Sequence, residues 1–325
     1  MKLPLAITFA TLYGMSLRIM FGLLNSFMGI MSISFLILVP VIIGFFTIIL
    51  TPIENTKSSI CAFFKPWITC LVILVITVVF NIEGTICWIL IYPLFSILAG
   101  IGGVIAYNIG KRKSSNSKSD DWEKPGMAGI SILLFLPCFL GLAEGDRSLT
   151  HEEFNISRSI LISSPTKKVW KVLTNIDEIT DGENTASFAN LVGFPKHIRT
   201  TLDTLAIGGK RMAIYEKGLY FDETIANYEP EKKLVLDIKT DPNKIPPTVM
   251  DEHIVIGGKH VDILQDVYKI EKISETSSRL TLSSRFFINT PFNWYVSVWA
   301  KYLMSDILQG ELNLVAARAT AKESK

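Results

Sequence analysis

The order of hydrophobic and polar positions divides the chain into two segments with different patterns. Up to about residue 149, long apolar runs alternate with short polar stretches. From residue 150 onward, apolar and polar residues alternate over short runs that are typical of strands, and the last thirty or so positions follow a helical period. The pattern predicts a multi-span transmembrane region at 1–149 and one soluble domain at 150–325.

Five apolar runs in the first segment are candidates for membrane-spanning helices, because a spanning helix needs roughly 20 apolar residues. The predicted spans cover about residues 3–24, 27–50, 67–81, 84–108 and 127–143. The fifth run is short and contains Pro137. A re-entrant segment is therefore the alternative interpretation for that run.

Two charged residues and a group of glycines stand out in the apolar segment. Arg18 lies near the end of the first run, so we expect its side chain to extend to the membrane surface rather than to pair with a buried acid. Glu83 lies in a short polar turn and is expected to be solvated. Gly100, Gly102 and Gly103 predict close helix packing in the fourth run.

The basic residues between the runs predict the orientation. The stretch 109–126 contains Lys111, Arg112 and Lys113, and the connection at 81–84 contains no Lys or Arg. Basic loops face the cytoplasm, so five spans place the N-terminus inside and the C-terminal domain outside. We therefore expect a multi-pass protein of the cytoplasmic (inner) cell membrane with an extracytoplasmic domain. A re-entrant fifth run would leave the domain in the cytoplasm.

The charge balance excludes one class of partner for the second segment. Residues 1–149 hold ten of the 32 Lys and Arg residues and seven of the 30 Asp and Glu residues, which leaves 22 basic and 23 acidic residues for 150–325. A nearly neutral domain lacks the basic face that nucleic-acid binding requires. All four cysteines lie in the first segment without metal-ligand spacing, and no cofactor or metal is predicted.

The second segment predicts an α+β domain. A strand at 154–163 is followed by a helix that Ser164 could cap, with Pro165 at its first position. Further strands are predicted at 197–205, 210–217, 219–228, 233–241, 249–256, 260–273 and 278–289, before a helix at about 291–320. Trp299 and Leu303 lie on the apolar stripe of that helix. A curved antiparallel sheet around a long C-terminal helix is expected to leave a cavity between them.

These elements and several short phrases resemble the START/Bet v 1-like (SRPBCC) superfamily, including its polyketide cyclase-like members. The resemblance covers roughly 154–320 and is carried by residues 163–170, 208–211, 221–225, 228–230, 268–271 and 278–282. It implies a helix-grip fold with a hydrophobic pocket. It implies no fixed catalytic set, because members include lipid carriers, cyclases and sensors.

Amphipathic side chains are the candidates for contact with a ligand, because each combines apolar surface with a polar group. The predicted ligand-pocket residues, which include two from the helix stripe, are Trp170, Tyr215, Tyr220, Tyr268, Arg285, Trp294, Trp299 and Leu303. The four histidines have no metal-ligand spacing. Asp251 with His253, and His260 with Asp262, could act as acid–base pairs but are interpreted as solvated pairs, so no catalytic residue is predicted.

The resulting hypothesis is a membrane-anchored protein that binds a hydrophobic small molecule, lipid or isoprenoid-like, beside the bilayer. Its expected partners are the lipid bilayer and that ligand, with no nucleic acid, and the sequence defines no protein partner. A membrane-tethered interaction or sensing module is the first alternative. A cyclase-type or hydrolase-type enzyme is the second, since enzyme activity is not the favoured interpretation.

Overall fold

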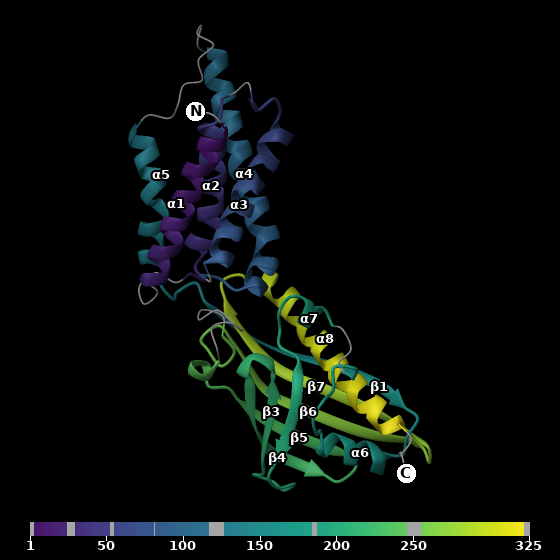
Figure 1. Ribbon diagram of the computed structural model, residues 1–325. Coiled ribbons are helices and arrows are strands. Elements are labelled where there is room, and N and C mark those ends of the chain that lie inside the picture. Colours follow the sequence, from purple (N-terminus) through teal and green to yellow (C-terminus); the bar gives the residue numbers. More distant parts are fainter. Residues whose placement is uncertain are drawn as a thin grey trace. The chain divides into compact units, whose positions relative to one another are not determined.

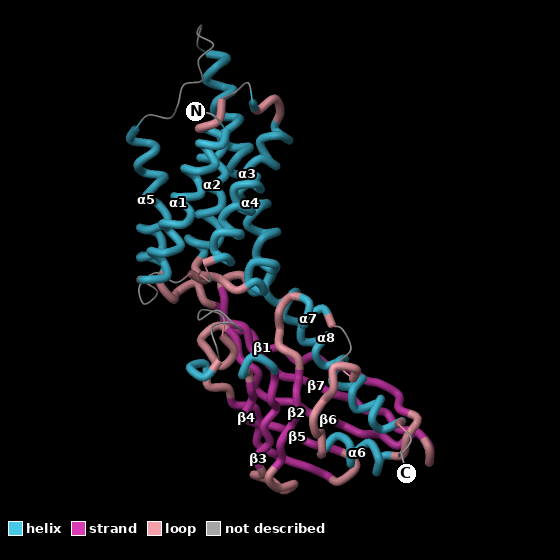
Figure 2. The backbone as a smooth tube through the Cα atoms, in the orientation of Figure 1, coloured by secondary structure: helices cyan, strands magenta, loops and turns pink. Residues whose placement is uncertain are grey.

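The protein forms two compact units, Met1–Leu149 and Thr150–Lys325. The computed structural model describes residues 3–24, 30–52, 55–80, 82–116, 127–183, 187–245 and 255–321. The described part of the first unit is helical, and that of the second unit combines a sheet with helices (Figures 1 and 2).

Apolar helices make up the first unit. They are α1 (Leu3–Leu23), α2 (Val39–Ile49) with the preceding helical turn Ser34–Leu38, α3 (Ser59–Val79), α4 (Thr85–Asn116) and α5 (Met127–Glu144). Three described segments are long and apolar enough to cross a membrane, namely Leu3–Leu23, Ser59–Val79 and Ile86–Lys111. The segments Ser34–Ile49 and Ser131–Glu144 are apolar but shorter.

Hydrogen bonds show how α5 runs along the other helices of this unit. The hydroxyl of Tyr13, in the middle of α1, donates to the carbonyl of Leu134, in the middle of α5, at 3.1 Å. The carboxylate of Glu144, at the end of α5, accepts from the backbone N–H groups of Ile33 and Ser34 at 2.7 and 2.9 Å. The end of α5 therefore lies beside the start of the α2 segment. The helix extends along the bundle instead of turning back within it.

Two glycines allow α2 and α4 to approach closely. A Cβ atom on Gly44 of α2 would lie 1.8 Å from a carbonyl oxygen of α4, and one on Gly102 of α4 would lie 1.9 Å from a carbonyl oxygen of α2. No side chain fits at either position without separating the helices. The close packing predicted for the glycines of the fourth run is confirmed at Gly102, and also at Gly100 and Gly103, where an added Cβ would clash with residues of α3.

The start of α3 and the environment of Arg18 correct two predictions. The helix begins at Ser59 rather than near residue 67, because the Ser58 hydroxyl accepts from the N–H of Cys61 at 3.2 Å and caps the first turn. Arg18 pairs with Glu83, and their side chains are only 13% and 9% exposed. The expectation of a solvated Glu83 and an unpaired Arg18 is therefore wrong, since a charge that is largely buried is stabilised by a partner.

The second unit is a sheet with one long helix and two short ones. Its strands are β1 (Thr150–Ile162), β2 (His197–Leu202), β3 (Lys210–Tyr215), β4 (Tyr220–Glu229), β5 (Lys233–Lys239), β6 (Val261–Ser274) and β7 (Ser277–Thr290). The short helices α6 (Thr166–Thr174) and α7 (Phe188–Leu191) lie between β1 and β2, and α8 (Asn293–Thr320) ends the domain. The strands form one antiparallel sheet in the order β1-β7-β6-β5-β4-β3-β2.

Alternating burial explains why these segments are strands. On β7, Leu280, Leu282, Phe286 and Ile288 are buried, and their neighbours in between are more exposed or polar. The predicted strand at 249–256 falls mostly outside the described residues. Within its described part, Ile256 forms an isolated bridge to Val261. The first helix of the domain begins at Thr166, and Pro165 rather than Ser164 is its cap residue.

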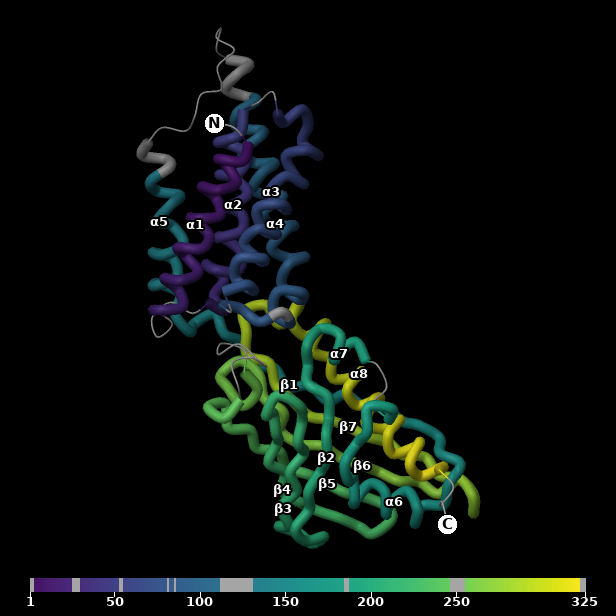
Figure 3. The backbone as a smooth tube through the Cα atoms, viewed as in Figure 1, coloured from purple at the N-terminus to yellow at the C-terminus, as the bar shows by residue number. Residues whose placement is uncertain are grey.

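The helix α8 packs along the sheet and closes the core (Figures 1 and 3). Its face in the core is formed by Met304, Leu308, Leu312 and Val315. Trp299 and Leu303, which were predicted to face the sheet, lie beside that face and are half-buried. The antiparallel sheet and its C-terminal helix are consistent with the expected helix-grip fold.

Candidate functional site

The inner face of the sheet carries an ion pair where apolar residues would be expected. Arg211 on β3 lies opposite Glu223 on β4. Atom Nη1 of Arg211 donates to Oε2 of Glu223 at 2.8 Å, and the side chains are only 5% and 6% exposed. Glu223 faces inward because it lies on the same face of the strand as the buried Phe221 and Ile225, each two residues away. The fold thus holds two opposite charges in its interior.

Strand β6 adds two more polar side chains to this interior. The guanidinium of Arg211 lies 5.9 Å from the centre of the Tyr268 ring. Asp266, two residues before Tyr268, lies opposite Ser284 of β7. Atom Oδ1 of Asp266 and Oγ of Ser284 are both buried without a hydrogen bond to another described residue. Buried polar atoms without a partner are uncommon in folded proteins, which makes these two side chains candidates for contact with a bound group.

A second ion pair joins the sheet to α8. His197, at the start of β2, places Nδ1 2.7 Å from Oε1 of Glu311 on α8. Its Nε2 lies 3.0 Å from the hydroxyl of Thr200, and its ring stacks on Tyr215 with 4.8 Å between ring centres. Both ring nitrogens are therefore engaged, which fixes the orientation of the imidazole.

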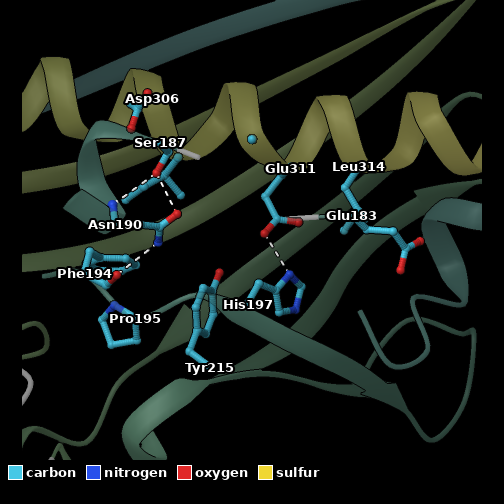
Figure 4. Close-up of a pocket in the computed structure, with 12 residues that line it drawn as sticks. Glu183, Ser187, Asn190, Phe194, Pro195, His197, Tyr215, Asp306, Glu311 and Leu314 are labelled. Carbon is cyan, nitrogen blue, oxygen red and sulfur yellow. Dashed lines mark hydrogen bonds and ion pairs between the residues drawn. The ribbon is translucent and has the colours of Figure 1, made fainter. Parts of the chain in front are cut away.

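A small pocket opens beside this second pair, between α8 and the segment that leads into β2 (Figure 4). Its volume is about 50 Å³. The residues that line it, most of them polar or aromatic, are Glu183, Ser187, Asn190, Phe194, Pro195, His197, Tyr215, Asp306, Ile307, Gly310, Glu311 and Leu314. Figure 4 shows the Tyr215 ring upright beside His197, with its hydroxyl toward α8. His197, Tyr215 and Glu311 thus form the inner part of the pocket.

The outer part of the pocket is a short segment fastened to α8. The Ser187 hydroxyl accepts from the N–H of Asn190 at 3.1 Å and caps α7. The carboxylate of Asp306 on α8 accepts from the N–H of Ala189 at 2.8 Å. Nearer the end of α8, Arg318 donates to Glu183 at 2.6 Å. These few hydrogen bonds hold the segment over the pocket.

Burial raises the pKa of each interior acid, but the net shifts of these pKa values differ in direction because the neighbouring charges differ. Burial raises the pKa of Asp266 to about 7, and the nearby Ser284 hydroxyl and Arg211 offset only part of that effect. The pKa of Glu223 is also raised by burial, against the opposing effect of Arg211. Burial is the largest single effect on Glu311 and acts to raise its pKa, but His197 and Arg211 together outweigh it and the pKa is lowered.

The charges of the interior leave one carboxyl group unmatched. Arg211 pairs with Glu223, and His197 pairs with Glu311. Burial is the largest single effect on His197 and acts to lower its pKa, but Glu311 and Glu223 together outweigh it and the pKa is raised. Among the described residues, Asp266 has no ion pair, and its pKa of about 7 allows it to gain or lose a proton near neutral pH. No group of three potential metal ligands occurs among the described residues.

The structure brings only some of the predicted pocket residues together. Tyr215 lines the pocket, and Tyr268 lies in the polar interior beside Arg211. Trp170 is a buried core residue of α6 that stacks on Tyr228. The other predicted residues do not line the described pocket; they are Tyr220 near Lys244, Arg285 paired with Glu153, the exposed Trp294, and the half-buried Trp299 and Leu303.

The charged residues of the interior were not predicted. They are His197, Arg211, Glu223, Asp266 and Glu311. A signal was present in the sequence, because Glu223 and Arg211 occupy positions of strands that otherwise hold buried apolar residues. Of the two carboxylate–histidine pairs interpreted as solvated, Asp251 and His253 lie outside the described residues. Atom Nδ1 of His260 lies 2.8 Å from the carbonyl oxygen of Asn289.

Comparisons with known proteins give only distant likenesses. No family model and no curated protein sequence matches the chain. A point mutant of norcoclaurine synthase from Thalictrum flavum is 8% identical, with a TM-score of 0.33, over 52% of this chain and 96% of that one. The Zhui aromatase/cyclase from Streptomyces sp. R1128 is 13% identical, with a TM-score of 0.33, over 52% and 94%. A START superfamily protein from Mycobacterium smegmatis is 10% identical, with a TM-score of 0.34, over 52% and 97%.

These neighbours are START/Bet v 1-like proteins, the superfamily that the sequence resembles. Identities and TM-scores this low carry no argument about function. The fold class therefore depends on the chain's own antiparallel sheet and C-terminal helix.

Proposed function

We propose that the 150–325 domain binds a small molecule with an apolar body and a polar head, and that the helical unit anchors the domain in a membrane. The observation that carries the proposal is the set of buried ionisable side chains beside a pocket. Apolar residues of similar volume are often at least as stabilising as a buried ion pair. Two such pairs and an unmatched acid inside one small core therefore support a binding role for the polar head.

The pocket must open to admit such a ligand. Its volume of about 50 Å³ is far below the roughly 300–1,000 Å³ of typical ligand pockets. Residues 187–197 cover it, and α8 holds Ala189 of this segment through the carboxylate of Asp306. We propose that this segment moves away from α8, exposing His197, Tyr215 and Glu311 to the polar head while the apolar body lies along the helix. A lipid or isoprenoid-like molecule has this combination of groups.

The helical unit is the proposed anchor. Apolar side chains cover much of its outer surface, including Leu12, Val75 and Phe139, which are 65%, 51% and 69% exposed. Exposed apolar area of this extent is unusual in water and normal in lipid. We propose that α1 to α5 all cross the cytoplasmic membrane. With the basic stretch 109–126 inside, this topology makes the C-terminal domain extracytoplasmic.

The test of ligand binding uses the full chain in detergent. Native mass spectrometry after exposure to total membrane lipid should show a bound small molecule. A Glu311→Gln/His197→Gln double variant, which keeps the shape but removes the charges, should lose at least tenfold in occupancy. The matched control is Arg279→Gln, at an exposed ion pair with Glu271. If no lipid binds to the wild type, or if the double variant retains every ligand, the proposed site is wrong.

Acid–base catalysis is a second candidate function, and Asp266 is the observation that favours it. A buried carboxyl with a pKa of about 7 can hold or release a proton at neutral pH. The test of this second function measures chemical conversion of the bound ligand rather than its binding. If the domain is an enzyme, ligands recovered from the wild type should include a product that is missing from Asp266→Asn, while both proteins bind the same parent molecule. Identical ligand profiles would leave binding as the function.

A further inference from the structure

An exposed apolar stripe follows the first three turns of α8. Trp294, Val298 and Tyr302 are 66%, 64% and 52% exposed and are spaced four residues apart, so they share one face of the helix. Leu191 of α7 is 80% exposed. The ring of Phe188, on the same short helix, lies 5.2 Å from that of Tyr302, so α7 borders this face. These four side chains, Leu191, Trp294, Val298 and Tyr302, are called the aromatic patch below.

The aromatic patch begins at the point where the chain enters the domain. The side-chain amide of Asn293, the residue before Trp294, donates to the carbonyl of Thr150 at 2.6 Å. Its Oδ1 accepts from the N–H of Thr290 at 3.0 Å, and Thr150 also lies opposite Thr290 in the sheet. The first residue of the domain and the first turn of α8 are therefore fixed to each other.

The link between the anchor and this point is short. Only residues 145–149 separate the end of α5 from Thr150. Five residues span at most about 18 Å when fully extended. The N–H groups of Arg147 and Leu149 also donate to the carbonyls of Glu144 and Asp146 at 3.1 and 3.2 Å, so the link is turned rather than extended. The length of the link therefore limits how far Thr150 can move from the end of α5.

We propose that the aromatic patch lies in the headgroup region of the bilayer and docks the domain on the lipid surface. This inference depends on the proposed membrane anchor but not on the proposed ligand site. Trp and Tyr are the residues that favour the membrane–water interface, because their rings are apolar and their N–H or O–H groups remain hydrated. The patch combines both residue types with two aliphatic side chains, and it adjoins the residue at which the link enters the domain.

The test measures quenching of tryptophan fluorescence in nanodiscs made of dibrominated phosphatidylcholine, using the full chain. Trp294→Phe removes the probe from the patch, and the difference from wild type reports Trp294 alone. The matched control is Trp294→Phe with Leu161→Trp, which moves the probe to another exposed apolar position. Leu161 lies eleven residues along β1 from Thr150, or roughly 36 Å at about 3.3 Å per residue.

The expected result is that bromolipid quenches the Trp294 contribution at least twofold and leaves the contribution of the relocated probe in the control variant unchanged. If bromolipid quenches the other tryptophans but not Trp294, the docking proposal would be overturned and the proposed anchor would stand. Equal quenching at both positions would show contact without a preferred face, and would also overturn it. If no tryptophan is quenched, the membrane anchor itself is wrong. If Trp294 is shielded from water but is not quenched by bromolipid, and the chain is dimeric, lipid docking would be overturned and the patch would be assigned to a second copy.

Discussion

At the scale of single residues, Asp266 makes the most direct prediction. Its folded pKa of about 7 lies above the ordinary value of 3.8, because burial disfavours the charged form. The protonated acid therefore stabilises the fold. That stabilisation is complete below about pH 3.8 and is lost progressively as the pH rises through 7.

The prediction is that Asp266→Asn removes this pH dependence. Between pH 5 and pH 8 the free energy of unfolding of wild type should fall relative to the variant by roughly 3 kcal/mol, at about 1.4 kcal/mol per pH unit below the pKa. Urea unfolding of the 150–325 unit at both pH values measures it. The other charged groups near Asp266, which are Glu223, Arg211 and Glu311, are common to both proteins. Parallel pH profiles would show that Asp266 is not buried as described.

A second prediction concerns the Arg211–Glu223 pair. Arg211→Leu should destabilise the domain by roughly 3–5 kcal/mol, because it leaves Glu223 buried without a partner. Arg211→Leu combined with Glu223→Leu should recover most of that loss. Denaturant unfolding of the four members of the cycle measures both effects. The matching change Arg279→Leu, at a half-exposed pair, should cost less than about 1 kcal/mol. A double variant as unstable as the single one would contradict the interpretation.

The charges of the interior show where sequence reasoning stops at this scale. Alternation predicts which strand positions face inward, and Glu223 stands at one of them. The pattern alone does not show whether such a charged residue lies in the core or whether the assigned inward and outward positions of the strand are wrong. Its partner Arg211 lies on another strand, so only the sheet pairing brings the two together. Tyr215 was predicted because its own side chain is amphipathic, which is a property that needs no partner.

At the scale of elements, α8 gives a paired prediction. Leu308 is 2% exposed and lies in the core, whereas Leu303 is half-buried beside it. Leu308→Ala should cost roughly 2–5 kcal/mol, because it leaves a cavity among packed side chains. Leu303→Ala should cost about 1 kcal/mol, as substitutions outside the packed core commonly do. Thermal or denaturant unfolding of the 150–325 unit compares the two. Equal losses would mean that the helix packs with the predicted stripe toward the sheet after all.

The order of elements was more predictable than the faces of the helices. Strand periodicity has a period of two, so burial repeats at every second residue and the segments of β3, β4 and β7 are well defined by their residues. The apolar stripe of α8 is broad, and its centre depends on what the sheet and α7 cover. The start of α3 depends on a single cap, Ser58, which a hydropathy pattern does not register.

At the scale of the whole molecule, the arrangement of α5 carries a prediction about topology. A reporter that is active only outside the cytoplasm, fused after Lys325, should be active, because an odd number of crossings moves the chain from one side to the other. Deletion of residues 127–144 should reverse this result. A cytoplasm-specific reporter at the same position is the control. Activity of that reporter in the full-length fusion would show that α5 does not cross the membrane.

The short link at residues 145–149 has a consequence for affinity. A site held within a few nanometres of a bilayer encounters molecules dissolved in that bilayer at an effective concentration in the millimolar range, as short linkers provide between two bound modules. A dissociation constant of about 1 mM, negligible for a protein free in solution, would leave such a site substantially occupied. Exchange at that affinity is fast. With the proposed anchor and ligand site, weak intrinsic binding would therefore be sufficient, and ligand screens on the detached domain would miss it.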